Sequence, residues 1–385
     1  MKKILFVINN MHLGGTRKSL LSLLNELSNI KDLQVDLMIL SHNGPLMKEI
    51  PDKINVLRKS EILEMATCNK YELTSITSKL FRAIIAFLHR IIGYDRVYPY
   101  IYKFAIKRRV KLVYDASIGF QEGISNDLAF YINAKKHYAW IHNDFDNFKH
   151  SKSDSGIERL YPLFDKVLFV AEASRKNFIK NHPLLENKCE VIKNTINSRV
   201  LLEKAEEPTK SYFKTNYIRF VTVGRVSEQK GYDRIINIAN KMKDKNLKFE
   251  WVVIGDGPKL EELIKSVKDN NLEEYLRFVG GKTNPYKIER QADLYVMTSR
   301  YESQPLVLIE SAILGLPIVT TNFDSAYEVV GSLKSAHICS NNEDSIRKFL
   351  EDIIIKHDIL EKMKKEAGRY EYDNHEIVER LLSLC

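Results

Sequence analysis

Short apolar runs rich in β-branched residues alternate with amphipathic stretches along almost the whole chain. The run at residues 3–8, for example, leads through a glycine pair into leucines at helical spacing over residues 17–27. Strands that alternate with helices are typical of parallel sheets, because each parallel connection needs a crossover. The pattern therefore predicts an α/β fold with strands within residues 3–8, 35–40, 54–58, 111–119, 136–142, 166–171, 189–194, 218–224, 248–257, 275–281, 293–299, 316–321 and 336–339.

A polar, charged segment at residues 204–216, interrupted by Pro208, divides these runs into two series. The chain of 385 residues also exceeds what one hydrophobic core usually supports. We therefore expect two doubly wound, Rossmann-like domains that face each other across a cleft lined by the carboxyl ends of their strands. The predicted parts are a first domain over residues 1–203, a linker at 204–216, a second domain over 217–370, and a C-terminal helix at 371–385 that can pack back on the first domain.

Composition narrows the cellular context. The four cysteines are scattered without a Cys-x-x-Cys motif, which favours a reducing compartment and argues against a disulfide framework or a zinc site. The first apolar run stops at Asn9, which is too short for a signal peptide. No run of about 18 apolar residues occurs, so we expect no membrane span and a cytoplasmic location.

Positive charge is concentrated in one stretch. The net charge is +9, and residues 79–111 alone hold nine basic groups and one acid. Such focusing indicates a partner with negative charge. One interpretation is a helix lying on an anionic membrane, and the other is an amphipathic helix packed on its own sheet with a solvated basic face. Nucleic-acid binding is disfavoured because no recognition module accompanies the charge. The apolar face of this helix comprises Phe81, Ile84, Ile85, Leu88, Ile91 and Ile92.

Two glycine-containing turns follow strands of the second series. After Gly224, a loop carries Arg225 and Lys230 to the start of a helix, where cations and unpaired N–H groups can hold a diphosphate. The alternative is two solvated loop cations. Gly257 opens the next helix and lets the backbone approach a ligand, but Leu260 stands where a dinucleotide motif has its third glycine, so a tight turn explains it as well.

Glu302 and Glu310 bracket seven uncharged residues. Pro305 suits the first turn of a helix, whose free N–H groups at Leu306 and Val307 would point at a ligand. Because helical side chains tilt toward the N-terminus, Glu310 would lean back to the same place. Carboxylates accept paired hydroxyl hydrogen bonds, so the pair favours a ligand with two diols, a ribose and a hexose, whereas the alternative leaves both groups in solvent.

These motifs together resemble the retaining glycosyltransferases of family 4, which have the two-domain GT-B fold. The resemblance rests on the glycine-flanked Arg225–Lys230 loop, the Gly255–Pro258 turn and residues 284–319, and it covers most of the chain. It implies that Glu302 contacts the donor sugar and that Glu310 binds the ribose. The diphosphate would be held by Arg225 and Lys230 with the amides near Leu306 and Val307.

The resemblance also assigns roles in the first domain. His142, after a strand, would face the sugar near the reacting carbon, and Gly14-Gly15 would let the backbone approach the donor phosphate and the acceptor. The alternative for His142 is a hydrogen-bonded rim residue. Asp115, Gln121 and Glu122 either line the acceptor side or cap a helix. The family commonly has Gly and an apolar residue where this chain has Ser303 and Gln304, which bears on donor choice.

The resemblance implies a retaining glycosyltransferase with an acceptor-side first domain and a donor-binding second domain. It would move a hexose or N-acetylhexosamine from a nucleotide-diphospho-sugar, UDP-linked rather than GDP-linked, to a glycan hydroxyl. No essential metal is expected, although Asp144 and Asp146 spell an Asp-x-Asp motif. From the basic stretch we expect a lipid-linked acceptor in capsule, lipopolysaccharide or other surface-polysaccharide synthesis, at the inner face of the membrane. A nucleotide-sugar epimerase and a non-catalytic scaffold of the same fold are the alternatives.

Overall fold

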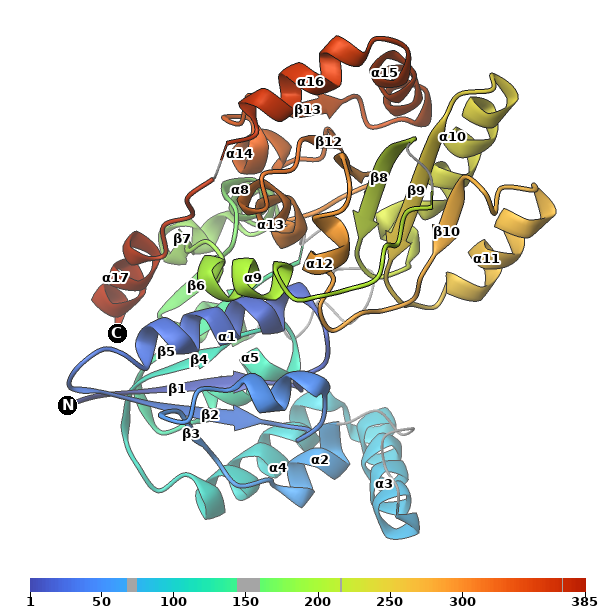
Figure 1. Cartoon of the computed structure of the whole chain (residues 1–385). Coiled ribbons are helices and arrows are strands. Elements are labelled where there is room, and N and C mark those ends of the chain that lie inside the picture. The colour runs from blue at the N-terminus through green and yellow to red at the C-terminus, as the bar shows by residue number, and fades with distance from the viewer. Residues whose placement is uncertain (68–74, 144–159, 215–216, 369) are drawn as a thin grey trace. The chain divides into compact units, whose positions relative to one another are not determined.

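The computed structural model describes residues 1–67, 75–143, 160–214, 217–368 and 370–385. They belong to two compact units, coloured from blue to red along the chain in Figure 1. The first unit comprises Met1–Val170, Ser174–Thr195 and Asn374–Cys385, and the second comprises Ala171–Ala173 and Ile196–Asp373. None of the helices in the described ranges is both long enough and apolar enough to cross a bilayer.

The sheet of the first unit is parallel throughout. Its strand order among the described residues is β3-β2-β1-β4-β5-β6-β7, so the order reverses between β1 and β4. This is the arrangement of a doubly wound fold. The strands are β1 (Lys2–Ile8), β2 (Leu33–Ile39), β3 (Asn55–Val56), β4 (Tyr114–Gly119), β5 (Ala134–Ile141), β6 (Lys166–Phe169) and β7 (Cys189–Val191).

Helices cover this sheet and extend beyond it. Helix α5 packs on β1, β4 and β5, α1 packs on β2, and α2, α3 and α4 pack on one another. The helices are α1 (Gly15–Leu27), α2 (Glu61–Thr67), α3 (Ile76–Ile92), α4 (Tyr94–Arg109), α5 (Ile124–Phe130) and α17 (His375–Leu384), with the 3-10 turns η1 (Pro45–Glu49), η2 (Tyr161–Leu163) and η3 (Pro183–Lys188). Helix α8 (Glu172–Asn181) begins at the boundary with the second unit.

The second unit contains a second parallel sheet. Its order over the described residues is β10-β9-β8-β11-β12-β13, with the reversal between β8 and β11. The strands are β8 (Ile218–Val223), β9 (Phe249–Ile254), β10 (Leu276–Phe278), β11 (Leu294–Met297), β12 (Ile318–Thr321) and β13 (Ala336–Cys339). Each of the predicted strand runs overlaps one strand of the first or second sheet, so the prediction of two doubly wound α/β domains is confirmed.

Two apolar layers enclose the second sheet because its strands are buried on both faces. Phe220 and Trp251 belong to the layer under α10, α11, α15 and α16, and Val221 and Tyr295 belong to the layer under α12, α13 and α14. The helices are α9 (Ser198–Ala205), α10 (Tyr232–Asp244), α11 (Leu260–Asp269), α12 (Tyr286–Glu289), α13 (Leu306–Ile313), α14 (Ala326–Val330), α15 (Glu343–Ile355) and α16 (His357–Glu366), and η4 is Glu228–Lys230.

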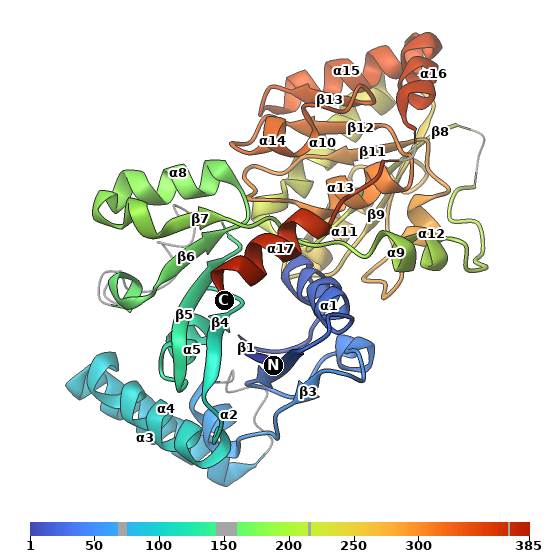
Figure 2. The same ribbon diagram turned by 90° about the vertical axis from the view of Figure 1, so that its left-hand side faces the viewer.

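The units divide the chain at Thr195, before the predicted linker at 204–216. Residues 198–205 form α9, and Leu201 and Ala205 pack with Leu306 and Ile309 in the second unit. The predicted linker therefore begins at the end of a packed helix. At the other end of the chain, α17 lies beside α1 in the first unit (Figure 2).

Candidate functional site

The loops after β8 and β11 lie where the strand order of the second sheet reverses. In open parallel sheets, ligands bind outside the carboxyl ends of the strands at such a switch point. The loop after β8 carries Arg225 and Lys230, and the loop after β11 carries Glu302 and Ser303. The topology therefore brings the two predicted motifs to one edge of one sheet.

Lys230 and Glu302 meet directly. The Lys230 Nζ lies 2.5 Å from Glu302 Oε1, although 72 residues separate them in sequence. The side chains are 17% and 9% exposed, respectively. Burial strengthens the attraction between the two charges, because solvent screens it less than it screens a surface ion pair.

Hydrogen bonds to backbone carbonyl groups join the two loops. The Arg300 N–H donates to the Gln229 carbonyl at 2.8 Å, and the Gln229 side-chain amide donates to the Tyr301 carbonyl at 3.0 Å. The Thr298 hydroxyl donates to the carbonyl of Lys230 at 3.0 Å. The pairing of Lys230 with Glu302 is therefore fixed by the backbone on both sides.

Arg225 is exposed at the start of the first loop and makes no ion pair with another residue that the structure describes. A Cβ on the neighbouring Gly224 would lie 2.9 Å from the Tyr232 hydroxyl. A Cβ on Gly257 would lie 2.3 Å from the Val226 carbonyl oxygen. Gly257 is therefore needed for the close contact between two loops of the unit itself, which is the tight-turn explanation.

Helix α13 begins beside Glu302. Pro305 is its N-cap residue, and no side-chain hydrogen bond caps this helix start within the described chain. The Leu306 side chain is buried in the core, so only its backbone faces the loop. Val307 is partly exposed. The Ser325 hydroxyl donates to the Ser303 carbonyl and holds the loop from behind.

Glu310 lies in the same helix and is buried. Its Oε1 accepts a hydrogen bond from the Tyr286 hydroxyl at 2.7 Å. The Tyr286 contact was not expected from the sequence, because a tyrosine in a short helix gives no signal of its partner. The hydrogen bond from Tyr286 thus fixes the position of the Glu310 carboxylate within the second unit.

Three buried hydroxyl groups close to these loops have no hydrogen-bond partner among the residues that the structure describes: Tyr232 Oη, Ser299 Oγ and Ser303 Oγ. A buried polar group without a partner costs roughly 1–3 kcal/mol. A polar ligand or an ordered water bound here would supply the missing partners. Sequence reasoning missed Tyr232, since its position follows the Lys230-Gly231 turn without belonging to the motif.

In the first unit, Gly14 and Gly15 mark the start of α1, the helix that follows β1 at the switch point of the first sheet. Gly14 has an extended backbone, with φ 163°, and a Cβ placed on it would meet no atom within 4 Å. The unit itself therefore does not require a glycine there.

His142 follows β5 and is buried. Its ring stacks on Trp140 and packs against Phe120, and its backbone N–H donates to Glu122 Oε2 at 2.9 Å. Burial, and secondarily the charge of Arg17, lowers the pKa of His142 to about 3. The imidazole is therefore neutral at physiological pH. It can donate and accept hydrogen bonds, but it does not act as a cation.

Glu122 and Asp115, two acidic residues of the first unit, have structural partners. Glu122 also accepts from the Asn143 amide, and burial raises its pKa. Glu122 therefore holds the end of β5. Asp115 binds the Lys3 N–H and pairs with Lys135. The Asp144-x-Asp146 motif lies outside the described residues, and within the described ranges no group of three or more potential ligands could hold a metal ion.

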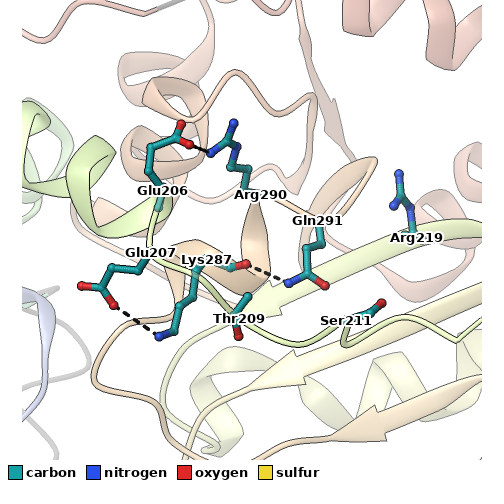
Figure 3. Close-up of a pocket in the computed structure, with 9 residues that line it drawn as sticks. Glu206, Glu207, Thr209, Ser211, Arg219, Lys287, Arg290 and Gln291 are labelled. Atoms are coloured by element: carbon teal, nitrogen blue, oxygen red, sulfur yellow. Dashed lines mark hydrogen bonds and ion pairs between the residues drawn. The ribbon is translucent and has the colours of Figure 1, made fainter.

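A separate hollow of about 450 Å³ lies in the second unit (Figure 3). It is lined by Ala205, Glu206, Glu207, Thr209, Ser211, Arg219, Lys287, Arg290 and Gln291. Its cations are already paired, Arg219 with Asp293, Lys287 with Glu207 and Arg290 with Glu206. Arg219 lies near the beginning of β8, away from the strand end that carries Lys230. None of the predicted site residues lines this hollow.

Comparison with known proteins finds a family match for the second part of the chain. Residues 203–370 match the family "Glycosyl transferases group 1". The N-acetylgalactosamine-N,N'-diacetylbacillosaminyl-diphospho-undecaprenol 4-alpha-N-acetylgalactosaminyltransferase of Campylobacter jejuni is 28% identical over 59% of this chain and 62% of its own length. The 2-deoxystreptamine N-acetyl-D-glucosaminyltransferase of Niallia circulans is 29% identical over 47% of each chain. The chain thus matches these relatives over about half to three-fifths of their length.

Solved structures show the same fold over the full length of the chain. Anabaena Alr3699/HepE, solved with UDP and glucose, has a TM-score of 0.72 at 14% identity and covers 100% of this chain and 99% of its own. Staphylococcus aureus TarM, solved with UDP, has a TM-score of 0.69 at 15% identity, with the same coverage. Residues 203–370 therefore match the glycosyl transferases group 1 family, and the chain as a whole has the GT-B fold of these solved structures.

Proposed function

We propose that this chain is a retaining glycosyltransferase that takes its sugar from a UDP-linked donor held by the second unit. The observation that carries the proposal is the buried Lys230–Glu302 pair at the switch point of the second sheet. A cation for the diphosphate and a carboxylate for the sugar lie side by side there, next to an uncapped helix start. A diphospho-sugar is the ligand that needs all three groups together.

The chemistry follows from these groups. The anomeric C–O bond to the diphosphate breaks, and an oxocarbenium-like sugar and an anionic leaving group separate. Arg225, Lys230 and the α13 N–H groups would stabilise the leaving charge, and removal of one such donor typically costs about 3 kcal/mol. The acceptor oxygen then bonds to the anomeric carbon on the same face, and its proton passes to the departing phosphate oxygen. Glu302 as a covalent nucleophile is the disfavoured variant, because in this scheme its carboxylate binds a sugar hydroxyl.

Further roles follow the same scheme. Glu310 would bind the ribose, Ser303 would help to select the sugar, and His142 and Gly14 would contact the donor from the first unit. His142 would act as a neutral hydrogen-bond partner of the sugar, since burial lowers its pKa to about 3. The cations and the helix start would perform the work of a metal, so we expect turnover to persist in excess EDTA.

For the acceptor we propose a lipid-linked glycan at the cytoplasmic face of a membrane, in surface-polysaccharide synthesis. The name of the Campylobacter jejuni relative specifies a diphospho-undecaprenol acceptor, which supports a lipid carrier. The names of both relatives specify transfer of an N-acetylhexosamine, which favours UDP-linked N-acetylhexosamines as the first donors to test.

The test is slow hydrolysis of a panel of UDP- and GDP-sugars without acceptor. We expect one UDP-sugar to release UDP, E302A to lose that activity while keeping UDP affinity within a few-fold, and R225A to lose UDP affinity by roughly 100-fold, the equivalent of one lost phosphate contact. R199A is the matched control, since Arg199 is exposed in the same unit and its ion pair is with Glu203, within its own helix. Binding of no nucleotide would refute the proposal.

The same assay separates the two alternatives. An epimerase would convert its UDP-sugar to an isomer without an acceptor, which chromatography of the recovered nucleotide sugar detects. A non-catalytic scaffold would bind no donor or leave every donor intact. A scaffold has no reason to keep the buried pair Lys230–Glu302. An epimerase would use the pair to hold the same UDP-sugar, so the identity of the recovered nucleotide sugar decides between epimerase and transferase.

A further inference from the structure

Helix α3 in the first unit has an exposed apolar side. Ile76, Leu80, Ile84, Phe87 and Ile91 follow one another at intervals of three or four residues, which places them on one side of the helix. Their exposed fractions are 84%, 62%, 49%, 63% and 61%. We call these five residues the apolar stripe.

The orientation of α3 is fixed by its other side. Ile85 is buried with 2% exposure, and Arg82 donates to the Tyr98 hydroxyl of α4 at 2.9 Å. Helix α3 packs on α2 and α4, and α3 and α4 lie side by side in Figure 2. The apolar stripe therefore faces away from the packed side of the helix.

This arrangement differs from the single apolar face expected from the sequence. Ile85 points inward and Phe81 is partly buried, whereas Ile84, Leu88, Ile91 and Ile92 are exposed. A helix packed on its own sheet with only basic residues in solvent does not account for the stripe. Further apolar side chains are exposed on α4 and directly after it, namely Tyr100, Phe104, Leu112 and Val113. Soluble monomers rarely leave this much apolar surface uncovered without a binding role.

Charge identifies the occupant. Lys79 and Arg90 are exposed and lie along one border of the apolar stripe on the helical wheel. Residues 79–111 hold nine basic groups against one acid. A second copy of the chain would bring this charge against itself, and a nucleic acid would leave the stripe uncovered. An anionic lipid surface satisfies both the apolar stripe and the cations.

We propose that α3 lies in the plane of an anionic bilayer, with the apolar stripe in the boundary between headgroups and acyl chains and with Lys79 and Arg90 at the lipid phosphates. This inference rests on the first unit alone and not on the proposed transferase activity. It also gives the chain a way to meet a lipid-linked acceptor.

The test is cosedimentation of the full chain with vesicles, in the absence of nucleotide sugar. We expect binding to phosphatidylcholine vesicles with 30% phosphatidylglycerol at 50 mM salt, at least about ten-fold tighter than to pure phosphatidylcholine, and a loss of this preference in 500 mM salt. F87S/I91S should lose at least roughly ten-fold in binding, and K79Q/R90Q about 25-fold, with five-fold for each cation.

Two control variants are available in the same unit. L184S removes an exposed leucine from η3, and K31Q removes an exposed lysine from the turn before β2. Both should bind vesicles like the wild type. All four proteins should keep the wild-type thermal midpoint, because each altered side chain is exposed.

The inference is overturned if the folded wild type does not bind anionic vesicles, or if the stripe variants bind as well as the controls. It is also overturned if the wild type is a dimer that F87S/I91S dissociates and no vesicle binding accompanies either state, since the stripe would then be an interface between copies. Vesicle binding by a chain that hydrolyses no donor would refute the proposed activity and leave this inference standing.

Discussion

The ion pair between Lys230 and Glu302 neutralises two largely buried charges in the ligand-free protein. An incoming diphosphate would compete with Glu302 for the Lys230 ammonium. Glu302 would then be released toward a sugar hydroxyl at the moment when the donor arrives. The pair would therefore keep the site stable when it is empty and prepare it for the donor.

We predict a non-additive stability cycle for this pair. K230M should destabilise the fold by about 3 kcal/mol, because it leaves the Glu302 carboxylate buried without a counter-charge. K230M/E302Q should recover most of that loss. Urea denaturation of the wild type, both single variants and the double variant measures the coupling. If the two single variants lowered the free energy of unfolding by amounts that simply add in the double variant, the two side chains would not interact.

His142 predicts a specific acid sensitivity. Its pKa in the folded protein is about 3, below the usual 6.5, so the unfolded chain takes up a proton at a higher pH than the folded chain does. Stability due to this residue is therefore complete above pH 6.5 and is lost as the pH falls toward 3. Between pH 7 and 5 the wild type should lose about 2 kcal/mol more than H142Q does.

Urea denaturation at the two pH values checks this. Glu122, whose pKa burial raises, contributes with the opposite sign and is present in both proteins, so the difference between them isolates His142. Parallel losses in wild type and H142Q would mean that the imidazole is protonated in the folded state.

At the scale of loops and helices, the glycines separate into two classes. Gly257 is required by the Val226 carbonyl, which a Cβ would approach to 2.3 Å, whereas Gly14 has open space around it. G257A should therefore cost about 2 kcal/mol of stability, and G14A less than about 0.5 kcal/mol. If the donor approaches Gly14, however, G14A should reduce UDP-sugar turnover at least ten-fold.

Thermal midpoints and donor hydrolysis of the two variants separate packing from binding. G14A with lower stability and normal turnover would reverse the assignment. The distinction could not come from the sequence, in which both glycines stand next to a helix start.

The elements themselves were largely predictable, and their contacts were not. Runs such as "KFEWVVIGDG" predicted strands because residues buried on both faces leave an apolar signal at short range. The motifs placed Lys230 and Glu302 at the ends of strands, but their pairing depends on β8 and β11 being neighbours in the sheet. Tyr286, which holds Glu310, comes from a third element, and no local pattern in the sequence links the two.

For helix α3, the sequence predicted the helix but not the side that packs inward. Its apolar residues extend so far around the helix that periodicity alone could not decide which half packs inward. Ile85 and Arg82 decide it, through contacts with residues of α2 and α4 that are distant in sequence.

At the scale of the whole molecule, the last helix of the chain packs on the first unit. Helix α17 buries Ile377, Val378 and Leu381, and the Leu384 carbonyl accepts from Lys136 and Tyr138. Deletion of residues 374–385 should therefore destabilise the first unit by about 5 kcal/mol, given roughly 1.5–3 kcal/mol for each buried apolar side chain.

Scanning calorimetry checks this deletion through the transition of the first unit. UDP affinity should stay within about three-fold of wild type, because Arg225 and Lys230 lie in the second unit. R380A, which removes the exposed side chain that pairs with Glu190, is the control and should cost less than about 1 kcal/mol. An unchanged first transition after the deletion would show that α17 is dispensable.

The return of the chain to its starting unit has a practical consequence for anyone who wishes to follow domain motion. Met1 and Cys385 both belong to the first unit, and most of the second unit, Ile196–Asp373, lies between two segments of the first. Fluorescent dyes on the two termini would therefore both be attached to the first unit. Energy transfer between them would stay constant if the two units moved relative to each other. A measurement of the distance between the units by energy transfer needs one of the two dyes within residues 196–373.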